Sequence, residues 1–505
     1  MKNRITLALT AMTTALVYGD SWPIESQNDW TANVASHSDF KIKDGRAIPT
    51  ASEATLQSVV KQFPTKRSIE SITVVQSPDW QNWTPVKPVG PVNMADAPVF
   101  LTKGPNDYWM FGMYGNKDQR EGFTGQAVEL DGFDVPLLTS PFKNQFDAPG
   151  GLKPSLGGYH AWQSRDMVNW VHHGPVTETF SRWVTTAEYV DGKTYLYYDY
   201  PNDQDPHVYI DEDLTDGMPG TNMGMAFKDP SNGSDCTFFR ASDGRFHVIY
   251  EDWSPINAKD HAWDSPLAGH AVSSDGLGDF QILPPAVDLR TTPTGVIKTH
   301  PHPHWKAHPD WDTNLAEYEE HLPVQDAFGD WCMIQVGEQF YLFGDYDHAE
   351  HSAGAGNPRK EAQAKMSIAR FTTNSLDEEF KLVGDFGKTG HPDPDIGFAE
   401  GQFYLVTQAD QDFVSPGPWV DTVEVRVGVD TNKDGAIDEW TAWQSISVHY
   451  DLVEGFAKLV SKTPASLDLS GLPEGYGFQF EMKVTETTKN GARPILDAVM
   501  VSFSE

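Results

Sequence analysis

The chain of 505 residues is strongly acidic, with 72 Asp and Glu side chains against 37 Lys and Arg, and its formal net charge is −35. An electrostatic field of this sign repels nucleic acid and anionic membranes, so neither is an expected partner. Hydrophobic residues make up 39% of the chain and aromatic residues 12%, which is enough for a large core. After the N-terminal segment, no run approaches the ~20 apolar residues of a membrane helix.

The first residues have the pattern of a secretory signal. Lys2 and Arg4 precede an apolar run from Ile5 to Val17, which ends near the small residue Gly19. This order of charge, apolar core and small residue is typical of a cleaved signal peptide. We therefore expect residues 1–19 to be a signal peptide and the mature protein to be periplasmic or secreted.

Residues 20–75 predict an N-terminal arm with one short helix. Most of this segment is polar, but Thr50 and Glu53 have the spacing of a capping box. The predicted helix runs from Ala54 to Phe63 and ends at Pro64, which cannot continue it.

One hairpin pattern recurs five times in the middle of the chain. In the segment 234–257, aromatic residues alternate up to the turn at Asp243-Gly244 and continue alternating after it. Similar hairpins are predicted at residues 95–113, 185–199, 329–345 and 395–408. Repeated units of this kind predict an all-β fold, a five-bladed β-propeller over residues 76–420, followed by a C-terminal β extension over residues 421–505. Cys236 and Cys332 fall within predicted strands, and we expect both to be buried free thiols.

An acidic residue opens most of these hairpins. Asp96, Asp235, Asp330 and Asp395 stand at or near the starts of the first, third, fourth and fifth hairpins. Any one of them can simply cap a turn. Because the innermost strands of a propeller converge on its axis, the four carboxylates are expected to meet there and to shift one another's pKa values. Glycoside hydrolysis requires such a separation between a neutral acid and an ionised base.

A histidine-rich loop follows the third hairpin. Residues 299–305 read THPHPHW, with His302 and His304 at alternate positions, and a short predicted helix over residues 314–321 carries Glu317 and His321. Alternate histidines on an extended segment can chelate a metal. A histidine acting as an acid or as a sugar-binding donor, and a solvated polar loop, are the other interpretations.

The segment Asp430 to Trp440 resembles a calcium loop. Asp430, Asn432, Asp434 and Asp438 occupy positions 1, 3, 5 and 9 of such a loop, and Gly435 provides its turn. Position 12 is Thr441 rather than Glu, so a full EF-hand is not expected. A structural calcium site and a plain Asx-rich hairpin turn both remain open, and no cofactor is expected to be required for chemistry.

Several longer strings resemble a known enzyme family. Two segments share the pattern Ser-x-Asp-x-x-x-Trp, at residues 77–83 and 164–170, which is similar to the propeller glycosidases of families 43 and 32. The strings at 254–271, 390–408, 415–435 and 472–484, together with HPHW near residue 301, resemble glycoside hydrolase family 117. Those enzymes are five-bladed propellers that release 3,6-anhydro-L-galactose from the ends of agar oligosaccharides.

The resemblance implies roles for particular residues. It implies an inverting mechanism in which Asp96 is the general base, and either Asp235 or Asp252 is a second, tuning carboxylate. It also implies a histidine as the acid, for which His302 is preferred, with His304 and His321 as rivals and Glu317 as the neighbouring carboxylate. Trp253 and Trp263 can stack on a sugar or pack in the core. The family's N-terminal arm is exchanged in a dimer, and the resemblance therefore implies a homodimer through the segment from Thr50 to Phe63, although the arm's Ser-x-Ala-x-x-Arg signature is absent from this sequence.

Two other classes of function stay open. A propeller polysaccharide lyase would act on a uronate polymer, and the chain offers Tyr159, His160, Arg165, His172 and His173 for that chemistry. A non-catalytic glycan-binding propeller would need none of these side chains for turnover. The acidic residues at the hairpin starts favour an exo-acting hydrolase with an oligosaccharide substrate over both.

Overall fold

The computed structural model describes residues 21–77, 90–91, 94–114, 123–130, 133–138, 145–146, 159–177, 183–199, 206–228, 235–252, 264–265, 267–288, 326–352, 355–386, 390–408, 414–416, 422–469, 471–485 and 493–504. The prediction of an all-β chain is confirmed, because these residues contain only two short helices, α1 (Gln27–Asn33) and α2 (Arg359–Gln363). Within this part of the chain, neither helix is long and apolar enough to cross a membrane.

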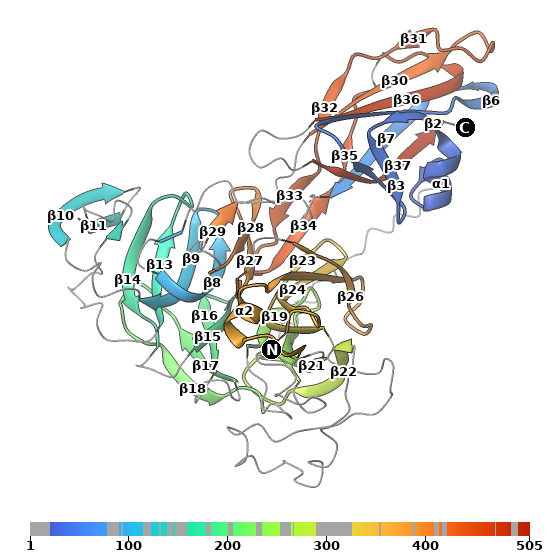
Figure 1. The fold of residues 1–505 in the computed structure, drawn as a ribbon. Coiled ribbons are helices and arrows are strands. Elements are labelled where there is room, and N and C mark those ends of the chain that lie inside the picture. The colour runs from blue at the N-terminus through green and yellow to red at the C-terminus, as the bar shows by residue number, and fades with distance from the viewer. Residues whose placement is uncertain are drawn as a thin grey trace, which may run out of the picture.

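Five sheets in chain order form the larger part of the described molecule (Figure 1). Their strands are β8 (Met94–Gly104), β9 (Asp107–Tyr114), β13 (Tyr159–Ser164) and β14 (Trp170–Pro175); β15 (Trp183–Val190), β16 (Lys193–Asp199), β17 (Pro206–Asp211) and β18 (Thr221–Met225); β19 (Thr237–Arg240), β20 (Phe246–Glu251), β21 (Leu267–Ser273) and β22 (Gln281–Asp288); β23 (Ala327–Val336), β24 (Gln339–Asp347), β25 (Ser367–Thr373) and β26 (Lys381–Phe386); and β27 (Asp395–Ala399), β28 (Gln402–Val406) and β29 (Val414–Pro416). The first strand of each sheet contacts the first strand of the next, and β27 contacts β8, so the five first strands close a ring.

The five predicted hairpins are all present. Strands β8 and β9, β15 and β16, β19 and β20, β23 and β24, and β27 and β28 pair antiparallel. The turns supply the positive φ angles that two-residue hairpins need, for example φ 51° and 85° at Asp191-Gly192 and 51° and 68° at Glu400-Gly401. Both predicted thiols, Cys236 and Cys332, are buried and free.

A small sheet lies beside the first of these five sheets. It consists of β10 (Phe123–Leu130), β11 (Phe133–Leu138) and β12 (Gln145–Phe146), which fall between β9 and β13 in the chain. Strand β12 contacts β14, so this insertion extends from the outer side of the ring.

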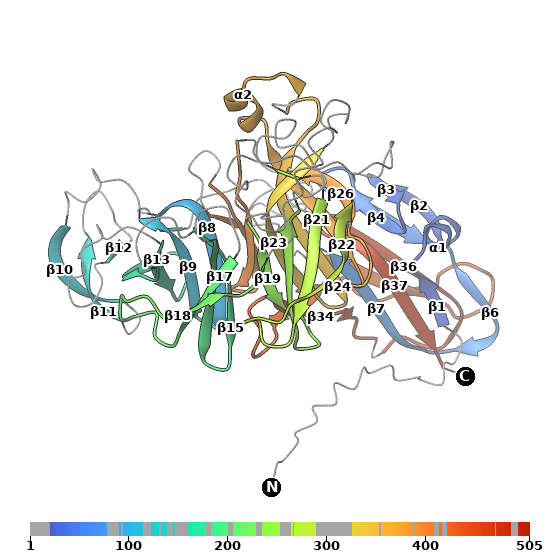
Figure 2. The ribbon, with the colours of Figure 1, turned by 90° about the horizontal axis from the view of Figure 1, so that it is seen from below.

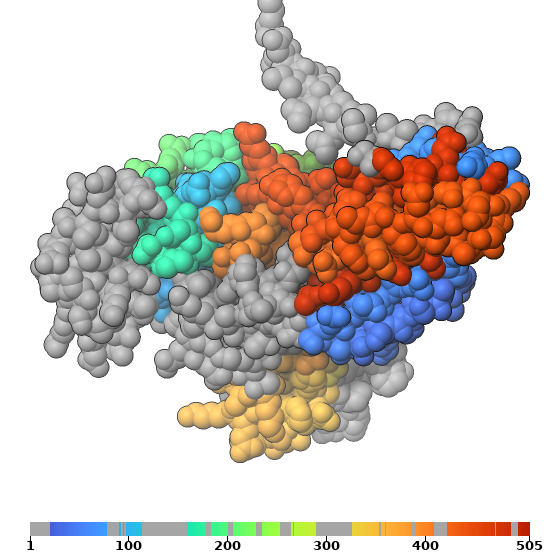
Figure 3. All heavy atoms as spheres, turned by 90° about the horizontal axis from the view of Figure 1, so that it is seen from above, coloured from blue at the N-terminus to red at the C-terminus, as the bar shows by residue number. Residues whose placement is uncertain are grey.

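The N-terminal and C-terminal segments build two further sheets together. One contains β1 (Ser21–Ile24), β3 (Phe40–Lys43), β4 (Arg46–Pro49), β7 (Ile69–Ser77), β35 (Ala465–Ser466) and β37 (Ile495–Phe503); the other contains β2 (Val34–Ser38), β5 (Glu53–Ser58), β6 (Lys61–Arg67), β30 (Val423–Asp430), β31 (Glu439–Trp440), β32 (Gln444–Ile446) and β36 (Gly475–Thr485). Their inner faces share one apolar core, which includes Trp22, Val425 and Phe480. Figures 2 and 3 show the blue N-terminal and red C-terminal strands side by side in this unit.

The helix predicted from Ala54 to Phe63 is wrong. This segment forms β5 and β6, and in β5 the side chains of Ala54, Leu56 and Ser58 are buried while the residues between them are more exposed. That period of two fits a strand with one face on a core, and β5 pairs with both β2 and β36. The capping box that forms a helix is instead at α1, where Ser26 and Asp29 bond reciprocally and Trp30 is buried.

One hairpin connects the two units. Strand β33 (His449–Leu452) pairs with β34 (Leu459–Thr463), and β34 runs parallel to the end of β23 in the fourth sheet of the ring. The C-terminal segment therefore contributes strands to both units.

Candidate active site

Acidic side chains gather at one end of the ring. In each hairpin the first strand starts where the second strand ends, because the two strands are antiparallel. Asp235 precedes β19 and Asp330 lies near the start of β23, while Asp199, Glu251 and Asp345 stand at or near the ends of β16, β20 and β24. The topology thus brings carboxylates from several sheets to the same end of the axis.

The backbone is irregular at this end. The pairing register shifts between Ala95 and Val99 in β8 and between Gly329 and Cys332 in β23. Asp330 lies inside the second bulge with φ 49°, and Asp235 has φ 55° just before β19. Bulges re-aim side chains and are common beside functional sites, and Asp330 stands in one of them.

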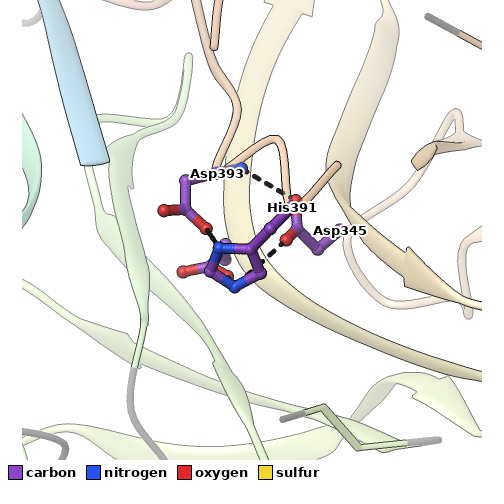
Figure 4. Close-up of side chains that lie close together, drawn as sticks. Asp345, His391 and Asp393 are labelled. Atoms are coloured by element: carbon purple, nitrogen blue, oxygen red, sulfur yellow. Dashed lines mark hydrogen bonds and ion pairs between the residues drawn. The ribbon is translucent and has the colours of Figure 1, made fainter. Parts of the chain in front are cut away.

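Three carboxylates and one histidine form the centre of this cluster, and Figure 4 shows Asp345, His391 and Asp393 side by side. Ligand atoms of Asp330, Asp345, His391 and Asp393 all lie within 4.8 Å of one another. His391 Nδ1 is 3.3 Å from Asp393 Oδ1, and His391 Nε2 is 3.6 Å from Asp345 Oδ2. The main-chain N–H of Asp393 donates to Asp345 Oδ1 at 2.9 Å, which fixes the loop before β27 against the end of β24.

Burial changes the protonation of these groups. It raises the pKa of Asp330 well above the usual range, and the charges of Asp393, Asp235 and Asp264 raise it further. The pKa of Asp345 is also raised well above normal, first by burial and then by Asp330 and Asp264. Burial lowers the pKa of His391 to about 4. These shifts favour a neutral imidazole at His391 and the protonated form of Asp330 and Asp345, and a protonated carboxyl group is the form that a general acid needs.

A second acidic pair adjoins the cluster at Gly329. A Cβ atom on this glycine would lie 1.9 Å from Glu251 Oε1 and 2.5 Å from Asp264 Oδ1. The absence of a side chain at Gly329 therefore makes room for both carboxyl groups. Asp264 is 1% exposed, and its pKa is raised well above normal by burial and then by the charges of Asp347 and Asp235.

Several buried oxygens in this region have no protein hydrogen-bond partner among the described residues. They are Asp264 Oδ2, Asp345 Oδ2 and both carboxylate oxygens of Asp347. Burial raises the pKa of Asp347 to about 6. Buried polar atoms are normally met by protein groups, water, ions or ligand, so these oxygens mark a place where a polar ligand or water can bind.

The central cluster also fits a divalent cation. Carboxylate oxygens are ligands for calcium and magnesium, and a neutral imidazole can add a nitrogen ligand for a transition metal. Asp330, Asp345, His391 and Asp393 would supply these ligands. A bound cation would favour the ionised carboxylates and so reverse the pKa shifts that burial produces.

The structure places some of the predicted site residues here. Asp235 belongs to the cluster, since its charge raises the pKa values of Asp264 and Asp330. Asp252 directly follows β20, and its main-chain groups bond to Leu267 and Ser265. Asp96 lies in β8, but its side chain is outside the described part of the structure. Also outside the described residues are Trp253, Trp263, His302, His304, Glu317 and His321.

Sequence reasoning missed six members of the site, namely Glu251, Asp264, Asp345, Asp347, His391 and Asp393. A signal for two of them was available. The second strands of three hairpins end in an acidic residue, at Asp199, Glu251 and Asp345, and this repeat is visible in the sequence. Asp264 and His391 stand outside the hairpins, so no periodicity indicated them.

The predicted calcium loop lies between β30 and β31, in the unit that the N-terminal and C-terminal segments build, and not in the ring. Asp430 Oδ1 accepts the N–H groups of Asn432 and Lys433, and Asp430 Oδ2 accepts that of Gly435. Asp438 Oδ2 accepts the N–H of Thr431 at 2.8 Å, and Asp434 accepts the N–H of Ala436. These bonds form a closed Asx-rich turn, and calcium binding by Asp430, Asn432, Asp434 and Asp438 stays a prediction.

Comparisons with known proteins find similar solved structures only. No family model matches the chain, and no curated protein matches it. A thermostable family-43 glycoside hydrolase is 12% identical over 75% of this chain and 96% of its own, with a TM-score of 0.39. An endo-arabinase from Bacteroides thetaiotaomicron is 10% identical over 66% of this chain and 96% of its own, with a TM-score of 0.37. A β-xylosidase/α-arabinofuranosidase from a compost metagenome, crystallised with xylotriose in a calcium-free form, is 12% identical over 72% of this chain and 98% of its own, with a TM-score of 0.38.

Proposed function

We propose that the protein is a glycoside hydrolase on a five-bladed propeller, with its active site in the acidic cluster at the end of the ring. The observation that carries this proposal is a group of carboxyl groups close enough to affect one another, in which the pKa values of Asp264, Asp330 and Asp345 are raised and the charge of Asp235 contributes to each shift. Cleavage of a glycosidic bond needs one protonated and one ionised group on opposite sides of the sugar. The raised pKa values of Asp264, Asp330 and Asp345 favour the protonated form that the acid needs.

The proposed reaction is hydrolysis with inversion. Asp96 takes a proton from the water that attacks the anomeric carbon, and the acid protonates the leaving oxygen on the other face. A separation of about 6.5 to 9.5 Å between base and acid leaves room for the water. Asp235, within the cluster, tunes the base. His302, supported by Glu317, is the preferred acid, because an imidazole titrates close to neutral pH.

The proposed substrate is a red-algal galactan oligosaccharide, from whose end a 3,6-anhydro-galactose is released. This part of the proposal rests on the resemblance of the strings at 254–271 and 390–408 to family 117. We also propose that the protein is exported to the periplasm or secreted, since Lys2, Arg4 and the following apolar run have the pattern of a signal peptide. A homodimer is a further proposal.

A polysaccharide lyase is the second candidate. A lyase must neutralise a uronate carboxylate, whereas the described groups at this end of the ring are mainly acidic. Two histidines that a lyase would need, His160 and His172, are 0% and 1% exposed and bond to each other inside the first sheet. Both observations favour the hydrolase. A non-catalytic glycan-binding protein would not need several carboxyl groups that raise one another's pKa values.

The function is tested by incubating the purified mature protein with defined agar and carrageenan oligosaccharides and analysing the products. The proposal predicts release of a single anhydro-galactose and, by NMR, an inverted anomeric configuration in the first product. A rise in ultraviolet absorbance on a uronate polymer, without release of a neutral sugar, would replace the hydrolase with a lyase.

A further inference from the structure

The hairpin β33–β34 lies at the end of the ring opposite the acidic cluster, because β34 pairs with the last residues of β23, Gln335 and Val336, whereas Asp330 lies near the start of that strand. Its segment 450–458 contacts all five sheets. Ala457 packs in the core shared by the first and second sheets. Arg240 of the third sheet donates to Gly455 O at 3.1 Å, and the Lys458 carbonyl accepts the N–H of Gln335 in the fourth at 2.9 Å. The ring of Tyr450 lies 5.3 Å from that of Phe403 in the fifth.

This closure places one ammonium group inside the ring. Lys458 is 3% exposed, and its Nζ donates to Thr186 Oγ1 at 2.8 Å and lies 3.5 Å from Asp395 Oδ1. Thr186 is in β15 and Asp395 is the first residue of β27, so the side chain reaches from the base of the ring to the start of an inner strand. A buried ammonium persists only where charged or polar partners compensate its desolvation.

Asp395, the partner of Lys458, also bonds to the first sheet of the ring. Its Oδ2 accepts the main-chain N–H of Phe100 at 2.7 Å. Phe100 is in β8, the strand that carries Asp96 four residues earlier, and among the described strands β8 has a hydrogen-bonded neighbour, β9, on one side only. On the same side, Thr102 Oγ1 donates to Phe398 O at 2.7 Å. A Cβ on Gly397 would lie 1.7 Å from the Phe100 ring, so the two strands meet closely.

We propose that Lys458 is a positioning residue for the active site: through Asp395 it holds strand β8, and with it Asp96, in place against β27. Asp395 accepts a hydrogen bond from the main-chain N–H of Phe100, at the edge of β8 where no described strand pairs with it. The ammonium of Lys458 keeps that carboxylate oriented and electrostatically balanced. The C-terminal segment thereby supplies a group on which the geometry of the opposite end depends. This inference rests on the proposed hydrolase function for its kinetic consequence only.

The test compares three variants of the full mature protein. Lys458→Met removes the charge at similar volume, and Lys458→Arg retains it. Lys462→Met is the matched control, because Lys462 lies in β34, four residues after Lys458, and pairs with Asp497 at 3.2 Å in the other unit. Each variant is measured for kcat and KM on an oligosaccharide that the wild type hydrolyses. Hydrogen–deuterium exchange of the peptide containing Phe100 is the second measurement, and it needs no activity.

The proposal predicts that Lys458→Met lowers kcat about tenfold or more, leaves KM within about twofold, and speeds exchange at Phe100. Lys458→Arg restores most of the kcat, and Lys462→Met behaves as wild type. Unchanged exchange at Phe100 in Lys458→Met would overturn the proposal, and so would unchanged kcat with a lower Tm alone. If Lys458→Met does not fold, Asp395→Asn must show the same faster exchange. If the wild type hydrolyses no glycoside, the proposed function fails while the exchange measurement still decides the role of Lys458.

Discussion

Replacement of Gly329 by alanine adds a single methyl group between the carboxyl groups of Glu251 and Asp264, and it therefore tests the geometry of the acidic site directly. The new Cβ would stand 1.9 Å from Glu251 Oε1 and 2.5 Å from Asp264 Oδ1. Carbon and oxygen atoms do not approach closer than about 3 Å, so the Glu251 carboxylate must move by about 1 Å or β23 must shift. Added volume of this kind in a packed site destabilises a fold by about 1–3 kcal/mol. A displacement of about 1 Å in a catalytic group lowers the rate on the order of 100-fold.

The assay for Gly329→Ala combines urea unfolding with steady-state hydrolysis of the oligosaccharide that the wild type accepts. Gly337→Ala is the control, because Gly337 is in the turn of the same hairpin, with φ +58° and its nearest atom 3.6 Å away. It should lose about 1 kcal/mol through backbone strain and keep its kcat. Wild-type stability and kcat in Gly329→Ala would refute the packing of Glu251 and Asp264 around this glycine.

Three further predictions concern pH, calcium and the helix cap. Burial lowers the pKa of His270 to about 3 and that of its partner His247 to about 4, so below about pH 6.5 the unfolded chain binds more protons than the folded one. Thermal stability should therefore fall from pH 6.5 toward 4, and His270→Gln should reduce this slope; an identical slope would contradict the assignment. If the loop at Asp434 binds calcium, millimolar calcium should raise Tm by a few degrees, and Asp434→Ala should abolish the shift. A shift that survives Asp434→Ala and is lost in Asp345→Asn would place the ion at the acidic cluster instead. Ser26→Ala removes the cap of α1 and should lower the unfolding free energy by about 1 kcal/mol in urea titration, and no change would show that this helix end does not depend on its cap.

The hairpins of the ring could be predicted because their signals are local. Alternating apolar residues around Asp243-Gly244 or Glu400-Gly401 define both strands and the turn within about fifteen residues. The acidic starts of the strands, such as Asp235 and Asp330, could be predicted to meet because the repeat implies a common axis. The raised pKa of Asp330 comes first from burial and then from the neighbouring carboxylates, and only the second cause could be expected from the repeat.

The second unit could not be predicted in the same way. Leu56 pairs with Met482, and Trp22 pairs with Val501. No local pattern indicates pairing over such separations. The capping box of Thr50 and Glu53 is a real local preference, but the sheet pairing of β5 on both edges overrides it.

Only part of the acidic site could be predicted, because some of its residues do not lie in the hairpins. Asp264 and His391 reach the cluster from segments between hairpins, where side-chain direction depends on tertiary contacts. Loop residues with positive φ, such as His391 at 60° and Asp393 at 40°, have no strand periodicity from which to infer their direction. Their roles became visible only from distances and burial.

Product analysis of the wild type beside Asp96→Asn and Asp345→Asn tests the central claim most directly. The account predicts release of one anhydro-galactose per chain end by the wild type, and a loss of at least about 100-fold in both variants, with unchanged folding by circular dichroism. Asp326→Asn is the matched control and should keep its activity, because Asp326 directly precedes β23 and accepts a hydrogen bond from the Tyr346 hydroxyl. Full activity of folded Asp345→Asn and Asp96→Asn would contradict a hydrolase centred on this acidic cluster.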